Sequence, residues 1–218
     1  MKTGAMLFCA LAVAGLAWGA DPLAPVKPAA TNSVPTELEM KGAVESYFAD
    51  LFQRLGKAAE KVPTEDTFRD VMRPLIGKVG GLFGATLIDA EWEIRQVYFR
   101  RDFLAVGFSL KKVKELDGFR KLMAEKPAPQ LSEPGHGDIM QPRLIAMRYP
   151  MIKDGKMTGM VSMMIRTESF LKAVKLDACK AYKITCLDKE AESKGVLTGA
   201  KKEVKIALPS TEWLIQYE

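Results

Sequence analysis

The sequence predicts an α+β domain in which one long N-terminal helix packs on one face of an antiparallel sheet. Apolar residues recur at helical spacing near the start of the domain. A strand–turn–strand pattern is centred on Asp154 and Gly155, and further strand-like segments follow to the C-terminus. A chain of 218 residues with 48% hydrophobic residues is long enough for one domain with a substantial core.

The N-terminal region is typical of export. Lys2 is followed by an apolar run over residues 5–18 and by small residues at the expected cleavage site, so residues 1–19 resemble a secretory signal peptide. Residues 20–35 are rich in Pro and Ala, which predicts a flexible linker. We therefore expect one domain over residues 36–218, a periplasmic or secreted location, and no membrane span in the mature chain.

Charge and motifs argue against nucleic-acid binding and catalysis. The chain has 32 basic and 27 acidic residues, and these are scattered rather than clustered. The sequence contains no nucleophile elbow, phosphate loop or zinc-protease motif. We expect no enzyme activity, no cofactor, no metal and no nucleic-acid partner.

Two cysteines, Cys179 and Cys186, remain in the expected domain. An exported protein allows a disulfide between them. However, the segment between them has the pattern of a strand, and seven extended residues separate Cα atoms by about 20 Å, beyond disulfide reach. Free thiols are therefore favoured, and a bridge stays open as the alternative.

The first predicted element is a long amphipathic helix. Thr36 and Glu39 form a capping-box pattern at its start, and Pro63 marks its end. Its apolar positions follow helical spacing: Met40, Val44, Tyr47, Leu51 and Leu55. A second helix is expected from about Thr64, kinked or shortened by Pro74.

The rest of the domain is expected to be mostly strands. Two strands with a turn near residues 89–91 are expected within residues 85–99, and a helical piece follows over 113–123. Residues 125–138 form a long loop rich in Pro and Gly. After the central hairpin, a helix is expected from about Thr167, followed by strands over residues 181–187, 203–208 and 212–217.

The Asp-Gly turn predicts the register of the central hairpin. A two-residue loop pairs Lys153 with Lys156. Counting outward, the predicted partners are Tyr149 with Met160, Met147 with Ser162, Ile145 with Met164, and Arg143 with Arg166. Cross-strand partners share a face of the sheet.

This register gives the hairpin two unlike faces. One face is mixed in character: Arg143, Ile145, Met147, Tyr149, Met151, Thr158, Met160, Ser162, Met164 and Arg166. The other is mostly apolar and is expected to receive the long helix: Leu144, Ala146, Arg148, Pro150, Ile152, Met157, Gly159, Val161, Met163 and Ile165. Arg148 does not suit the apolar face. Mixed polar and apolar linings are typical of pockets for small ligands.

Two features of this hairpin leave alternatives open. Arg143 opposite Arg166 requires a negative group, which could be a ligand carboxylate, Glu133 or Glu168, or the two arginines could be solvated. The methionines of the second strand suggest a Cu(I) site. Because Met160 and Met164 point away from Met157 and Met163, core filling is favoured.

The hairpin resembles that of the extracytoplasmic Cache (PAS-like) sensor domains. The residues that carry this resemblance are Pro150, Asp154, Gly155, Lys156, Gly159 and Val161, followed by Glu168, Phe170 and Leu171. Residues 87–89, 182–184 and 212–214 resemble other strands of that family. The resemblance implies a stand-alone domain with a sheet of five or six antiparallel strands, a long helix on one face, and a small metabolite on the other. Members usually bind organic acids or amino acids outside the membrane.

The chain departs from the family in two respects. Members that bind amino acids carry an aspartate where Met164 stands here, so amine recognition is not implied. No transmembrane helix or output module follows the domain in this sequence. A partner that reads the bound state is therefore expected.

The sequence thus predicts an exported, non-catalytic domain that binds a small, anionic metabolite, with a carboxylate suspected. The expected polar contacts are Arg143, Tyr149, Ser162 and Arg166, the expected apolar lining is Met147, Met160 and Met164, and weaker candidates are Tyr98 and His136. The alternative is a ligand-free interaction module of the cell envelope that dimerises through the N-terminal helix. Exposed Tyr47, Phe48 and Phe52 would favour it.

Overall fold

The computed structural model describes residues 34–76, 78–99, 106–135 and 143–218. These residues belong to one compact unit that spans residues 33–218. The predicted signal peptide, nearly all of the predicted linker and His136 lie outside the described residues.

Helix α1, Glu37–Ala59, begins at the predicted capping box. The Thr36 backbone N–H donates to Glu39 Oε2 at 2.7 Å, and the Glu39 backbone N–H donates to Thr36 Oγ1 at 3.2 Å. Helix α2, Phe68–Ile76, includes Pro74 and starts later than predicted. The delay arises because Thr64 and Thr67 close a turn, in which the Thr64 N–H donates to Thr67 Oγ1 at 2.9 Å.

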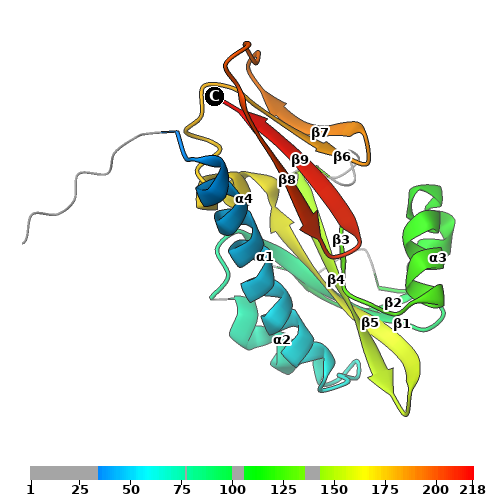
Figure 1. The fold of residues 1–218 in the computed structure, drawn as a ribbon. Coiled ribbons are helices and arrows are strands. Elements are labelled where there is room, and N and C mark those ends of the chain that lie inside the picture. The colour runs from blue at the N-terminus through cyan, green and yellow to red at the C-terminus, as the bar shows by residue number, and fades with distance from the viewer. Residues whose placement is uncertain (1–33, 77, 100–105, 136–142) are drawn as a thin grey trace, which may run out of the picture. The chain divides into compact units, whose positions relative to one another are not determined.

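The strands form two antiparallel sheets (Figure 1). The larger sheet has five strands in the order β2-β1-β5-β4-β3: β1 Leu82–Asp89, β2 Ile94–Phe99, β3 Gln130–Leu131, β4 Leu144–Lys153 and β5 Lys156–Arg166. The smaller has four in the order β7-β6-β9-β8: β6 Tyr182–Cys186, β7 Lys189–Lys194, β8 Lys202–Leu208 and β9 Thr211–Tyr217. The predicted α+β, PAS-like fold with a long N-terminal helix is confirmed.

Shorter helices connect these strands. The expected helical piece after β2 consists of 3-10 turns η1 Leu110–Lys112 and η2 Lys114–Leu116 followed by α3 Asp117–Glu125. Helix α4, Thr167–Ala173, follows the central hairpin as predicted. Strands β3 and β7 were not predicted, and the three closing strands belong to a sheet of their own.

The turn of the central hairpin is confirmed, but its predicted register is wrong. Asp154 and Gly155 have φ angles of 52° and 75°, as the mirror-image two-residue turn requires, and Lys153 pairs with Lys156. Beyond Ile152 and Met157 the register shifts, so that Met151 pairs with Gly159. Every later pair is therefore displaced by one residue.

A β-bulge at Thr158 and Gly159 causes the shift. Gly159 has φ +148°, and a Cβ atom at this position would lie 2.4 Å from the carbonyl oxygen of Ile88 on β1. Glycine is therefore required where β5 bends against its neighbour. Because a one-residue slip exchanges faces, the side chains of β4 lie on the faces opposite to those predicted.

Helix α1 covers one face of the larger sheet and joins it to the smaller one. The buried sheet residues in this core are Ile145, Met147, Met151, Val161, Met163 and Ile165. Phe48 of α1 stacks on Phe170 at 5.2 Å and meets Trp213 of β9 edge-on at 5.3 Å. The helix-facing prediction is confirmed for Val161, Met163 and Ile165 of β5, whereas it is wrong for the β4 residues and for Met157, which packs on the other side.

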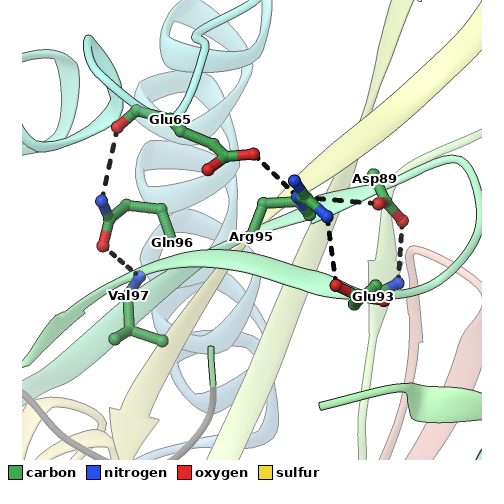
Figure 2. Close-up of polar contacts among 6 residues, drawn as sticks. All are labelled: Glu65, Asp89, Glu93, Arg95, Gln96 and Val97. Carbon is green, nitrogen blue, oxygen red and sulfur yellow. Dashed lines mark hydrogen bonds and ion pairs between the residues drawn. The ribbon is translucent and has the colours of Figure 1, made fainter. Parts of the chain in front are cut away.

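An ion-pair network fixes the turn between β1 and β2 to the segment before α2 (Figure 2). Arg95 Nε lies 2.7 Å from Glu65 Oε1, and Arg95 Nη1 lies 3.1 Å from Glu93 Oε1. The Glu93 N–H donates to Asp89 Oδ1 at 2.8 Å. Since these side chains are exposed to solvent, such ion pairs contribute little to the stability of the fold.

We predict that Gly159→Ala destabilises the domain by about 3 kcal/mol, because it adds a Cβ against a backbone oxygen at a positive φ. Chemical denaturation measures this change. Gly42→Ala is the control, since Gly42 is exposed in α1 with open space around it, and it should stabilise by about 0.5–1 kcal/mol. Equal stability of the two variants would contradict the role given to the bulge.

Candidate functional site

A row of buried polar side chains crosses the larger sheet on the face opposite α1. Thr86 of β1 pairs with Ser162 of β5, Ser162 pairs with Arg148 of β4, and Arg148 pairs with Gln130 of β3. Since directly opposed residues share a face, the four side chains form one continuous row. Six polar or charged residues are buried among those that the structure describes, and these four are the majority.

Arg148 is the charged member of the row. Its side chain is 7% exposed, and its guanidinium lies 4.1 Å from the ring centroid of Phe119 in α3. Burial lowers the pKa of Arg148 to about 10, and the charge of Glu133 opposes that shift. Arginine still stays cationic at neutral pH. The sheet therefore holds a buried guanidinium, a group whose N–H donors form strong hydrogen bonds to anions.

Gln130 supplies a second group suited to an anion. Its side-chain nitrogen Nε2 is buried and has no hydrogen-bond partner among the described residues. A buried donor without an acceptor costs about 1–3 kcal/mol. The hydroxyls of Thr86 and Ser162 continue the row beyond Arg148.

Apolar side chains border the row on one side. Ile88, Val97, Met160 and Met123 of α3 form a small buried cluster, against which Trp92 and Phe119 pack. On the other side, Gly84 and Ala146 flank Met164, which is half-buried. The row thus lies between the buried apolar cluster on one side and Gly84, Met164 and Ala146 on the other.

Three predicted site residues lie on this face. Ser162 is in the row, Met160 is in the buried cluster, and Met164 lies beside the row. Met147 and Tyr149 lie on the opposite face, because the bulge shifts the register. A Cβ on Gly56 of α1 would lie 3.0 Å from the Tyr149 ring, so that ring packs closely on the helix.

The predicted arginine pair does not form, because Leu144 rather than Arg143 pairs with Arg166. Arg143 contacts β7 instead: its Nη2 donates to the Ala191 carbonyl at 2.7 Å, and its Nη1 lies 3.1 Å from Glu192 Oε2. Arg166 is exposed at the end of β5, with its guanidinium 5.3 Å from the Phe83 ring.

Of the two weaker candidates, Tyr98 does not join the row. Tyr98 packs against the main core on the helix side, with Arg69 5.9 Å above its ring. His136 lies outside the described residues.

Sequence reasoning missed Thr86, Gln130 and Arg148. Arg148 had one signal, since it was the residue that did not suit the expected apolar face. Thr86 and Gln130 had no comparable signal, because only strand pairing aligns them with Ser162 and Arg148.

The helix side does not show the surface expected of a dimerisation module. Phe48 and Phe52 are buried, and Tyr47 is half-buried. An open recess of about 540 Å³ lies between α1, residues 78–81 and α4. Its charged lining residues are of both signs, Asp50, Lys78 and Lys172, and all of them lie on the side of the sheet away from the row.

Cys179 and Cys186 are buried free thiols, and burial raises the pKa of Cys186 to about 12. Within the described ranges, no three His, Cys, Asp or Glu side chains gather in a metal-binding arrangement. None of the described helices has the length and hydropathy of a membrane span.

We predict that Arg143→Ala destabilises the domain by about 1 kcal/mol at neutral pH, because it removes a hydrogen bond and leaves Glu192 unpaired. Burial raises the pKa of Glu192 and Arg143 opposes this rise, so loss of Arg143 raises that pKa further. In Arg143→Ala, the charged form of the Glu192 carboxylate is therefore destabilised relative to its protonated form. The destabilisation should shrink as the pH falls through these raised pKa values toward 4.5, the ordinary pKa of this group, because the carboxyl is then protonated in both folded proteins.

Urea denaturation at several pH values tests this prediction. Arg166→Ala is the matched control and should change stability by less than about 0.5 kcal/mol, because Arg166 is exposed. A pH-independent loss in Arg143→Ala would count against the pairing with Glu192.

No model of a known protein family matches the sequence, and no curated protein matches it. Similar solved structures include an extracellular ligand-binding receptor from Desulfohalobium retbaense, at 15% identity and a TM-score of 0.64 over 83% of this chain and 39% of that one. The chain thus spans about two fifths of that receptor.

Two chemoreceptor domains match over most of their own length. The ligand-binding domain of Pseudomonas fluorescens CtaA, in complex with L-alanine, has 15% identity and a TM-score of 0.61 over 83% of this chain and 92% of that one. That of Pseudomonas aeruginosa PctB, in complex with L-Arg, has 11% identity and a TM-score of 0.61 over 84% and 90%. The predicted resemblance to the Cache sensor domains is confirmed at the level of the fold: the chain folds like the ligand-binding domains of chemoreceptors.

Proposed function

We propose that this protein is an extracytoplasmic, non-catalytic sensor-type domain that binds a small organic anion on the sheet face opposite α1. The observation that carries the proposal is the buried guanidinium of Arg148 within a buried polar row. The fold supports it, since the similar solved structures are an extracellular ligand-binding receptor and two ligand-binding domains of chemoreceptors. Export, which the sequence predicts, fits the extracellular setting of that receptor.

A carboxylate suits the chemistry of the row. A guanidinium binds a carboxylate through two parallel N–H···O bonds, and this pairing is strongest away from water. The Gln130 amide and the hydroxyls of Thr86 and Ser162 can donate to further oxygens of the ligand. We propose that its apolar part lies toward Met164, where Gly84 has no side chain and Ala146 has only a methyl group.

The row supports binding rather than chemistry. It holds one cation, one amide and two hydroxyls, and none of its four side chains is a general base beside a nucleophile. The ligands named for the similar structures, L-alanine and L-Arg, both carry a carboxylate. We propose that this chain recognises that shared group.

We predict that at least one small carboxylate stabilises the domain through Arg148. The panel is acetate, propionate, pyruvate, L-lactate, succinate, L-alanine and L-arginine, with propionamide as the uncharged control. A binder at about 100 times its Kd adds about 2.7 kcal/mol, read as a rise in Tm by differential scanning fluorimetry. No shift across the panel, confirmed by calorimetry, would argue against the proposed function.

Variants of the arginines locate the site. Arg148→Gln should abolish the shift, and Arg148→Lys should weaken binding, because lysine keeps the charge but lacks the two-pronged geometry. Arg166→Gln should bind as the unmodified protein does, since Arg166 is exposed at the strand end. Circular dichroism verifies folding of each variant. Equal losses in Arg148→Gln and Arg166→Gln would place binding elsewhere.

We predict opposite effects of Gln130→Leu on stability and on affinity. Removing a buried donor that has no partner among the described residues should leave the ligand-free domain equally stable, or more stable by about 1 kcal/mol. The affinity for the carboxylate should fall about fivefold, which corresponds to one lost hydrogen bond of about 1 kcal/mol. Urea denaturation and calorimetry measure the two quantities. Loss of stability without loss of affinity would indicate a purely structural glutamine.

A further inference from the structure

Phe119 is the aromatic residue in contact with the charged member of the row. It lies in α3, and the guanidinium carbon of Arg148 is 4.1 Å from its ring centroid. Arg148 is also the one charged residue of the described chain that is buried. A cation–π contact gains strength when its cation is desolvated, as Arg148 is, although Phe119 itself is half-buried.

The ring of Phe119 is itself held in place. Trp92, in the turn between β1 and β2, meets it edge-on with ring centroids 5.5 Å apart and an interplanar angle of 88°. Met123, one turn later in α3, is fully buried in the same small cluster as Met160 and Ile88. Phe119 therefore has a defined position relative to the sheet.

Stacking on a ring suits an arginine that binds an anion. When an aromatic ring stacks on a guanidinium, it covers the flat face, whereas the N–H groups lie in the plane and point outward from its edge. Stacking therefore restricts the rotation of a guanidinium without using its N–H donors. An unsupported arginine would pay that ordering entropy on binding.

We propose that Phe119 is a positioning residue, which orients Arg148 for the carboxylate through its aromatic face. This inference rests on the proposed function for its ligand, but the orientation itself is a property of the ligand-free protein. The competing explanation is that Phe119 only fills the small cluster around Met160 and Met123.

Two variants separate these explanations. Phe119→Leu keeps an apolar side chain and removes the ring, whereas Phe119→Tyr keeps the ring. Leu110→Ala is the packing control, because Leu110 packs on the same cluster. The first measurement is the NMR resonance of the Arg148 Nε–H group in ligand-free protein, assigned by its loss in Arg148→Lys.

We expect a ring-current shift of this resonance that Phe119→Tyr and Leu110→Ala retain and Phe119→Leu removes. With the panel carboxylate that gives the largest rise in Tm, Phe119→Leu should raise Kd five- to tenfold. Phe119→Tyr and Leu110→Ala should stay within twofold, although Leu110→Ala lowers Tm. If Phe119 only filled the cluster, Phe119→Leu and Leu110→Ala would both lower Tm and would change Kd to a similar extent.

Two outcomes would overturn the inference. One is an Arg148 resonance that is unchanged in Phe119→Leu. The other is a Kd for Phe119→Leu equal to that of the unmodified protein while Arg148→Gln still abolishes binding, which leaves the proposed function standing. If no panel carboxylate binds, the proposed function fails, and the resonance alone decides whether Phe119 orients Arg148.

Discussion

The bulge at Gly159 is the constraint on which the rest of the larger sheet depends. The close approach of the Ile88 carbonyl leaves no space for a side chain at this position, and the extra residue in β5 shifts all later pairs with β4 by one. With that shift, Tyr149 and Met147 face α1, and Arg148 joins Ser162 on the other side. The bulge thus places core residues of both strands on the side toward α1, and Arg148 and Ser162 together on the other side.

The two faces differ in what they contribute to stability. The helix-facing side buries a large, continuous apolar core that includes the aromatic contacts among Phe48, Phe170 and Trp213. The other side has a much smaller apolar cluster and carries a buried cation and an amide nitrogen that has no hydrogen-bond partner among the described residues. A buried donor without an acceptor weakens a fold. We infer that the main core compensates for a face that is organised for binding.

Much of the fold could be predicted because its signals are local. The capping box at Thr36 and Glu39, the turn at Asp154 and Gly155, and α4 depend on residues close in sequence. The register could not be predicted by counting from the turn, although a glycine inside a strand is a known sign of a bulge. Strand β7 has the sequence KEAESK, whose polar residues match no strand pattern, and pairing with β6 determines its structure.

The site was harder to predict than the fold for the same reason. Ser162, Met160 and Met164 were assigned to the correct strand face, because their own alternation along β5 holds beyond the bulge. Gln130 belongs to a strand of two residues within a segment rich in proline, and its partner Arg148 is 18 positions away in sequence. Only the assembled sheet brings the row together.

The buried cysteines bear on how the chain matures. Attack on a disulfide requires a thiolate, and burial raises the pKa of both Cys179 and Cys186 and so keeps them protonated. In the oxidising compartment that the proposed export implies, the folded domain is therefore a poor substrate for thiol exchange. Neither cysteine forms a disulfide in the described part of the chain, and a protonated, buried thiol is slow to form mixed disulfides with other proteins.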